Sequence, residues 1–154
     1  MSALTVLHSR YDAVTARLSG AMPESLVLAF VRVVLAGIFW RSGRTKVEEG
    51  SWFQLSETTY ELFRTEYAGV PLPPELAAVL ATAAEHALPA LLLAGLFTRL
   101  SALGLLGMTM VIQFFVYPDA WWGEHSLWTA LALILIARGA GRFSLDGMVA
   151  RGRT

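Results

Sequence analysis

Residues 75–98 read ELAAVLATAAEHALPALLLAGLFT, and this stretch decides the fold. It is apolar almost throughout, with Glu85 and His86 at its middle. A helix of about 20 residues crosses a hydrocarbon core that is ~30 Å thick, so this stretch is long enough to span a bilayer. A carboxylate near mid-depth is costly unless it is paired or protonated. We therefore expect another part of the chain to face Glu85.

The composition is typical of a membrane protein. The chain has 154 residues, which allow one domain, and 55% of them are hydrophobic. Charged residues make up 16%, below the roughly 25% of soluble domains. A net charge of zero and the lack of a basic stripe argue against nucleic-acid binding. The sequence has no cysteine, which excludes iron–sulfur ligation and thiol chemistry, and we expect no metal site.

Four apolar segments predict an all-α integral membrane protein, a four-helix bundle. The predicted spans are about 25–42, 75–97, 100–117 and 124–138. Between the first two, residues 51–67 place aromatic side chains on one face of a charged helix, which predicts an amphipathic helix at the membrane interface.

The regions outside the spans complete the predicted organisation. Residues 1–22 form an N-terminal amphipathic surface segment, since they have no long apolar core and are not expected to act as a signal peptide. Residues 23–147 form the membrane domain, and residues 148–154 form a basic cytoplasmic tail. Arginines are concentrated on the side that holds both termini and the turn at residues 98–99. By the positive-inside rule, this predicts a multi-pass protein of the bacterial cytoplasmic membrane with both termini in the cytoplasm.

Arg32 is the partner that we expect for Glu85. Arg32 lies about eight residues, ~12 Å, from the cytoplasmic start of the first span, and Glu85 lies about twelve residues, ~18 Å, from the cytoplasmic end of the second. A long arginine side chain can close this gap. The pair has two readings, a structural link between two antiparallel helices or part of a functional site.

Several hydrogen-bond donors and aromatic side chains are predicted to lie near the outer side of the membrane, away from the cytoplasm. They are Lys46, Gln113, Trp121, His125 and Trp128. Such a set suits a planar ligand with carbonyl oxygens, and we name Arg32, Lys46, Glu85, Gln113, His125 and Trp128 as candidate cofactor-binding residues. Interfacial anchoring by Trp, Lys and His is the alternative reading.

The histidines argue against haem. Two axial histidines must share a depth, whereas His86 is predicted ~15 Å below the outer membrane edge and His125 at that edge. Glu85-His86 also lacks the second histidine of an H-E-x-x-H metal motif.

Three segments carry a resemblance to a known family. They are VRVVLAGIFWRSGRTKV (31–47), EHALPALLLAGLFTRLSAL (85–103) and GAGRFSLDG (139–147). Their order and spacing resemble the DoxX family of small four-helix bacterial membrane proteins, over roughly residues 25–147. The matching positions are Arg32, Gly43, Lys46, Glu85, Gly95, Thr98, Arg99, Gly141, Ser144 and Asp146.

The resemblance implies a membrane component of a redox system. Family members are associated with thiosulfate:quinone oxidoreductase, with the quinone pool or with oxidative-stress enzymes, and many have no assigned activity. Quinone is thus the one cofactor that the resemblance suggests, with a soluble or membrane redox protein as partner. Handling a quinone requires no metal, because proton donors near its oxygens and a stacking aromatic ring suffice.

Three functions remain open at the level of sequence. The first is a quinone-interacting redox subunit. The second is a non-catalytic scaffold that docks a partner enzyme through residues 51–67 or the tail 148–154. The third, less favoured, is a small-molecule transporter formed as a homo-oligomer, although the sequence shows no inverted repeat. The sequence identifies neither a catalytic residue, the electron donor nor the oligomeric state.

Overall fold

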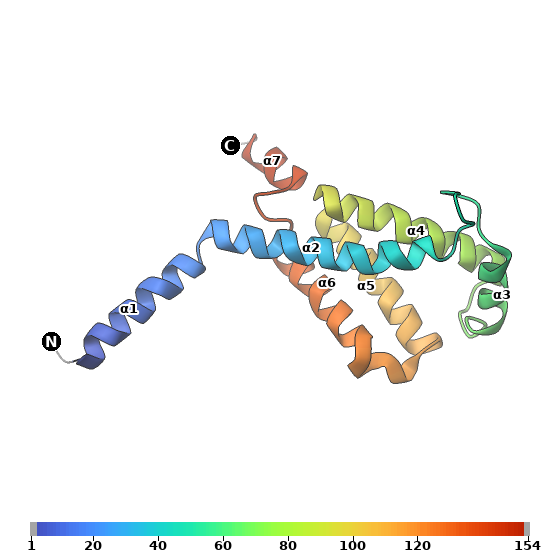
Figure 1. The fold of residues 1–154 in the computed structure, drawn as a ribbon, viewed down its shortest axis with the longest axis horizontal. Coiled ribbons are helices and arrows are strands. Elements are labelled where there is room, and N and C mark those ends of the chain that lie inside the picture. The colour runs from blue at the N-terminus through green and yellow to red at the C-terminus, as the bar shows by residue number, and fades with distance from the viewer. Residues whose placement is uncertain (1–2, 153–154) are drawn as a thin grey trace.

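The structure is a computed structural model that describes residues 3–152, and helices make up most of it (Figure 1). The α-helices are α1 (Ala3–Leu18), α2 (Ala21–Arg44), α3 (Glu57–Thr65), α4 (Pro74–Ala94), α5 (Thr98–Phe115), α6 (Ser126–Arg138) and α7 (Leu145–Arg151). A 3₁₀ turn (η1, Pro118–Ala120) and a π-helical turn (η2, Trp121–His125) lead from α5 into α6. No strand occurs among residues 3–152, so the all-α prediction is confirmed.

Three of these helices are long and apolar enough to cross a membrane. They are α2, α4 and α5, which correspond to the first three predicted spans. The α-helical part of the fourth predicted span, α6, has only 13 residues, although η2 adds five residues directly before it. That α6 crosses the membrane therefore stays a prediction.

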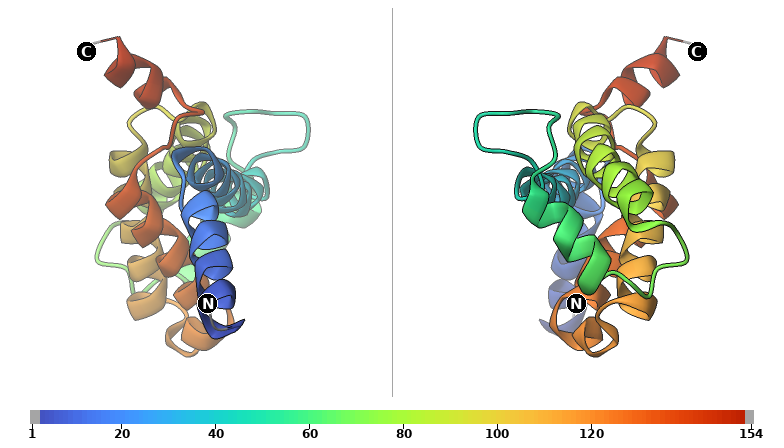
Figure 2. Two further views of the ribbon diagram at one scale, coloured as in Figure 1. Left: turned by 90° about the vertical axis from the view of Figure 1, so that its left-hand side faces the viewer. Right: turned by 90° about the vertical axis from the view of Figure 1, so that its right-hand side faces the viewer.

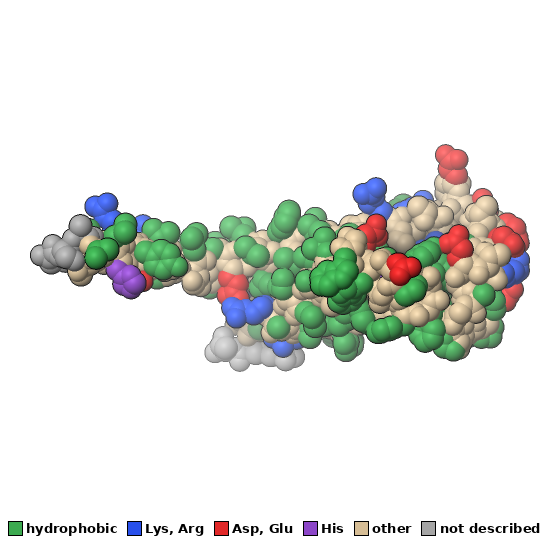
Figure 3. All heavy atoms as spheres, turned by 90° about the horizontal axis from the view of Figure 1, so that it is seen from below, with side chains coloured by type: hydrophobic (Ala, Val, Ile, Leu, Met, Phe, Trp, Pro, Cys, Tyr) green, Lys and Arg blue, Asp and Glu red, His purple; other side chains and the backbone are tan. Residues whose placement is uncertain are grey.

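The core lies between α2, α4, α5 and α6. Helix α2 packs against α4 and α6, and α5 packs against the same two helices. Large side chains that are almost fully buried fill the space between them, namely Leu35, Phe39, Leu92, Leu105 and Leu135. The two end-on views show these helices grouped together (Figure 2). Many apolar side chains face outward instead, and in Figure 3 they cover much of the middle of the visible face.

Helices α1 and α3 were both expected, with different bounds. Helix α1 lies within the predicted N-terminal surface segment, and it extends away from the other helices with nearly every residue exposed (Figure 1). Helix α3 begins at Glu57 instead of residue 51, because Ser56 caps it by accepting a hydrogen bond from the Thr59 N–H at 3.3 Å. Before this cap the chain forms a loop closed by a bridge between Val47 and Leu55. The position of both helices relative to a bilayer stays a prediction.

Candidate functional site

Glu85 is buried in α4 and paired with Lys46. The Lys46 Nζ lies 2.8 Å from Oε2 of Glu85 and 3.1 Å from Oε1, and the two residues are only 6% and 2% exposed. The Ser42 hydroxyl joins them, since it accepts a hydrogen bond from Nζ at 3.0 Å and donates to Oε1 at 3.1 Å. A buried carboxylate is tolerated only with such compensation. The prediction that Glu85 faces a cation is confirmed, but the cation is Lys46.

The end of α2 explains why Lys46 reaches Glu85. Helix α2 ends at Arg44, and Lys46 follows Ser42 by one helical turn. Gly43 lets α2 approach α4 closely, because a Cβ there would lie 3.0 Å from Glu85 Cβ. The carbonyl of Lys46 accepts hydrogen bonds from the Ser56 N–H at 3.1 Å and the Thr59 hydroxyl at 2.8 Å. The start of α3 thus fixes the backbone that carries the ammonium group.

Arg32 does not meet Glu85, so that part of the prediction is wrong. Its guanidinium donates to the carbonyls of Leu92, at 3.2 Å, and of Leu93, at 3.4 Å. It also donates to the carbonyl of Phe143, in the segment that leads to α7. Leu92 and Leu93 lie about two helical turns beyond Glu85 along α4. Arg32 therefore holds the opposite end of the helix pair together and takes no part in the Lys46–Glu85 site.

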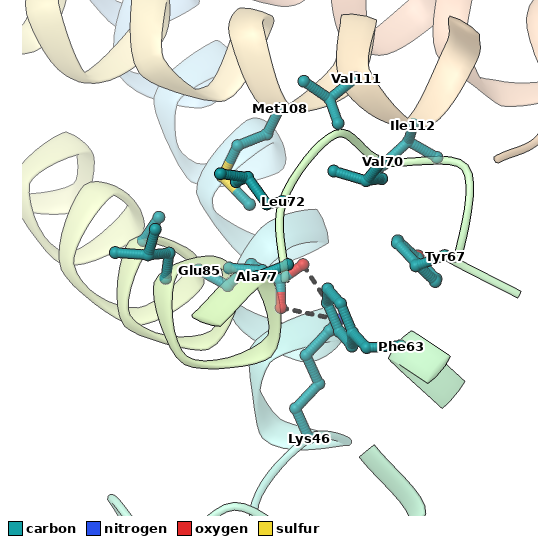
Figure 4. A pocket seen from close by; sticks show the side chains of 13 residues that line it. Lys46, Phe63, Tyr67, Val70, Leu72, Ala77, Glu85, Met108, Val111 and Ile112 are labelled. Carbon is teal, nitrogen blue, oxygen red and sulfur yellow. Dashed lines mark hydrogen bonds and ion pairs between the residues drawn. The ribbon is translucent and has the colours of Figure 1, made fainter. Parts of the chain in front are cut away.

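A cavity with mostly apolar walls opens directly beside the ion pair (Figure 4). It measures about 240 Å³ and lies between α3, α4, α5 and the segment that joins α3 to α4. We call it the apolar cavity. Its lining includes Lys46, Phe63, Tyr67, Leu80, Ala81, Glu85, Met108 and Val111. Among residues 3–152, Lys46 and Glu85 are the only charged residues in its lining, which gives the cavity one polar end.

Tyr67 contributes an aromatic face and a neutral hydroxyl to this cavity. Its ring stacks on Phe63 with the ring centroids 4.5 Å apart. Burial, and to a smaller extent the neighbouring Tyr117 and Glu85, raise the pKa of Tyr67 to about 12. The phenol therefore keeps its proton throughout the physiological pH range and remains a hydrogen-bond donor.

A second cavity of about 460 Å³ meets the first at Tyr67, Glu85 and Ile112, which line both. We call it the polar cavity. Its remaining lining residues are Ile38, Phe39, Ser42, Tyr117, Ala120, Glu124, His125 and Trp128. Two of the predicted site residues, His125 and Trp128, thus line a cavity that Glu85 lines as well.

His125 is held in one orientation by Gln113. The Gln113 Nε2 donates to the Pro118 carbonyl at 2.6 Å, which turns its Oε1 toward His125. That oxygen accepts a hydrogen bond from the His125 Nδ1 at 2.7 Å. The ring centroids of Trp128 and His125 are 5.1 Å apart. His125 itself is 2% exposed and closes the π-helical turn η2, a local distortion that is frequent at functional sites.

The structure thus brings five of the six predicted residues to one end of the molecule. Lys46 and Glu85 form the ion pair, His125 and Trp128 line the polar cavity, and Gln113 positions His125 from behind. Sequence reasoning missed Ser42 and Tyr67. Ser42 has a signal in hindsight, because it precedes Lys46 by four residues, the spacing that places two side chains on one helical face. Tyr67 has none, because its position depends on how α3 packs.

The comparisons with known proteins concern the same region. The DoxX family model matches residues 27–118, which include Lys46, Glu85 and Gln113 but not His125. A protein of Haemophilus influenzae, described as an uncharacterized protein, is 28% identical over 129 residues, which cover 79% of this chain and 82% of that protein. No solved structure matches the chain. Since the family model covers more than half of its residues, the chain belongs to the DoxX family of membrane proteins.

Proposed function

We propose that this protein is the membrane subunit of a redox system and binds a quinone headgroup in the apolar cavity. The observation that carries the proposal is the ion pair at the polar end of that cavity, with Lys46 and Glu85 buried and joined by Ser42. A quinone is a flat apolar ring with carbonyl oxygens, so it needs an apolar space with a few placed hydrogen-bond donors. The Tyr67 hydroxyl is a donor of this kind, and the Lys46 ammonium supplies a positive charge at the polar end of the same cavity.

The size of the cavity favours a headgroup over a large ligand. A volume of about 240 Å³ is somewhat below the ~300 Å³ at which sites for drug-sized ligands begin. Leu80 and Val111 line the cavity and are also 51% and 39% exposed, on α4 and α5. The cavity therefore reaches the apolar surface between these helices. A ring inside and an isoprenoid tail in the lipid would match this arrangement.

The chain's residues would assist the reduction of a bound quinone in two ways. Lys46 would stabilise negative charge that develops on the nearer quinone oxygen, since an ammonium in a dry site interacts strongly with such charge. Glu85 is a carboxylate in the ion pair, so it would first take up a proton and then pass it to that oxygen. Two such transfers would supply the two protons that the two-electron reduction of a quinone consumes. The electrons would come from a partner protein.

We further propose the orientation in the cytoplasmic membrane that the arginines predict. The end of the bundle that carries Arg99, Arg138, Arg142 and Arg151 would face the cytoplasm, and α3 with both cavities would face outward. The quinone would then be bound near the outer leaflet.

The test is the quinone content of the protein after mild purification from native membranes. We expect wild-type protein to retain quinone in lipid nanodiscs and the double variant Lys46→Met/Glu85→Gln to lose most of it. The double variant removes both charges together, so that neither is left buried and unpaired. Arg41→Met is the matched control, because Arg41 is an exposed cation near the same end of α2. Equal quinone content in the double variant and the control would refute the proposal.

A scaffold function is the second candidate, and one observation favours it. The loop before α3 projects from the helices (Figure 2), and its residues Trp52 and Phe53 are 59% and 91% exposed. Exposed aromatic side chains are typical of protein contacts and of membrane interfaces. If the scaffold function holds, Trp52→Ser/Phe53→Ser will abolish capture of a redox partner from the membrane, whereas Lys46→Met/Glu85→Gln will not.

A further inference from the structure

The polar cavity connects the surface of the molecule to the buried acid. At one end its lining includes Tyr117 and Glu124, both exposed, and at the other Ser42 and Glu85. Its volume of about 460 Å³ exceeds many times the ~30 Å³ that one water occupies in the liquid. Hydroxyl, carboxylate and imidazole groups in the lining offer each water several partners. The cavity therefore has both the room and the polarity that ordered water requires.

We propose that the polar cavity is an aqueous vestibule through which protons reach Glu85 from the α3 end of the molecule, with His125 as the intermediate proton carrier. The inference rests on the proposed function in one respect, since it supplies the protons that quinone reduction consumes. Glu85 would pass a proton from the vestibule to the apolar cavity, because it lines both. Water access itself does not depend on quinone.

His125 is the side chain in the lining that is best suited to carry a proton. Nδ1 already donates to Gln113, which leaves Nε2 as the nitrogen that can take up and release a proton. Imidazole is the side chain whose ordinary pKa, about 6.5, lies closest to neutral pH. The hydrogen bond that Nδ1 donates to the Gln113 Oε1 fixes the tautomer and the orientation of the ring.

The other titratable groups that face the polar cavity have different roles. They are Tyr67, Glu85, Tyr117 and Glu124. Tyr67 stays protonated because burial raises its pKa to about 12. Tyr117 donates to Glu66, which raises its pKa as well. The two phenols are therefore unable to exchange protons near neutral pH. The groups that remain as proton carriers are Glu124, at the exposed end of the polar cavity, His125 and Glu85.

Cysteine labelling tests water access directly, because the natural chain has no cysteine. The variants are Ile38→Cys in the polar cavity, Glu49→Cys on the exposed loop and Ala36→Cys in the core, where Ala36 is 0% exposed. The probe is a charged, water-soluble methanethiosulfonate reagent. We expect Ile38→Cys to react within about tenfold of the rate of Glu49→Cys. Reaction of Ile38→Cys as slow as that of Ala36→Cys would overturn the vestibule.

Trp128 provides a readout of the proton on His125. An imidazolium ion quenches a nearby indole, and Trp128 lies 5.1 Å from His125. The test protein carries Trp128 as its sole tryptophan, with Trp40, Trp52, Trp121 and Trp122 replaced by Phe. We expect its emission to fall on acidification, when the neighbouring imidazole takes up a proton.

The control variants assign this response to a residue. His125→Gln should abolish the fall in emission, while Glu124→Gln should preserve it. A flat emission in the parent protein, or a fall that persists in His125→Gln, would overturn the role of His125. Neither experiment contains quinone, so the vestibule can stand where the quinone proposal fails, and the reverse also holds.

Discussion

At the scale of single residues, Lys46 and Glu85 hold opposite charges while both side chains are almost completely buried in the protein. Removing charges from water costs several kcal/mol per ion, and the mutual attraction and the Ser42 hydrogen bonds offset this cost. The pair is therefore weak evidence for added stability but strong evidence that neither charge can be removed alone.

The ion pair predicts a pattern of stabilities. Lys46→Met alone should lower the free energy of unfolding by about 3–5 kcal/mol, because it leaves a buried carboxylate unpaired. Adding Glu85→Gln should recover most of that loss. Arg41→Met, at an exposed position, should change stability by only about 0.5 kcal/mol or less. Denaturation in detergent measures all three, and a double variant less stable than Lys46→Met would contradict the reading.

Tyr67 predicts an alkaline limit to stability. In the folded protein its pKa is raised to about 12, whereas an unfolded tyrosine titrates near 10. The folded state therefore binds more protons between these values, and stability should fall as the pH rises from about 10 to 12. Below pH 10 the contribution is complete. Ultraviolet titration of tyrosinate should show a late component that Tyr67→Phe removes, and an unchanged titration curve in that variant would contradict the assignment.

At the scale of elements, the turn between α4 and α5 joins three distant segments. Gly95 ends α4 with φ +66°, and Phe97 continues the turn with φ +48°. Asp146 accepts hydrogen bonds from the N–H groups of Phe97, at 3.0 Å, and Thr98, at 2.9 Å, and so caps α5. Arg32 reaches this turn from α2 and binds the carbonyl of Phe143 before α7. Arg32 thus has a structural role, because it links α2 to the end of α4 and to the segment before α7.

The surroundings of Gly95 predict that this turn does not tolerate a side chain at that position. A Cβ at Gly95 would lie 2.3 Å from an Arg32 nitrogen and 2.4 Å from Ser144 Cβ. Gly95→Ala should therefore destabilise the protein by about 2 kcal/mol or more, from overpacking and the positive φ. Gly107→Ala is the control, since nothing lies within 4 Å of its Cβ position in α5, and it should be neutral or stabilising. Similar melting temperatures for the two variants would show that the turn tolerates a side chain.

The elements also show what the sequence could and could not predict. The lengths of the apolar segments predicted the positions of α2, α4 and α5, and Glu85 within an apolar segment predicted a cation beside it. The wrong partner came from assuming that α2 and α4 end at the same depth. In the structure Gly43, at the end of α2, lies against Glu85, which is well inside α4. Relative helix register depends on close packing at Gly43 and on the support of Lys46 by α3, and neither has a periodic signal.

At the scale of the whole molecule, the contacts place the start of α2, the end of α6 and the start of α5 on one side. Arg138, at the end of α6, pairs with Glu24, at the start of α2. Asp146 contacts the start of α5. The π-helical turn η2 and α6 together return the chain from the α3 end to this side. An even number of crossings follows if the helices lie in a bilayer as we propose.

Reporter fusions test this arrangement. A reporter active only in the cytoplasm should be active at both termini, and one inserted after Gly50, in the exposed loop before α3, should be inactive. The physical reason is the concentration of arginines at the end opposite α3. Activity at one terminus only would mean that α6 does not cross, and would contradict the proposed orientation.

The location of bound quinone is the most direct test of the account. A photoreactive azidoquinone, activated in native-membrane nanodiscs, marks the residues that surround the headgroup, and mass spectrometry of peptides identifies them. We predict labelling of peptides from α4 and α5 that include Ala81 and Met108, which line the apolar cavity, and loss of this labelling with excess unmodified quinone or in Lys46→Met/Glu85→Gln. Labelling confined to α1 or α7, or labelling that neither treatment reduces, would contradict a quinone site at the Lys46–Glu85 pair.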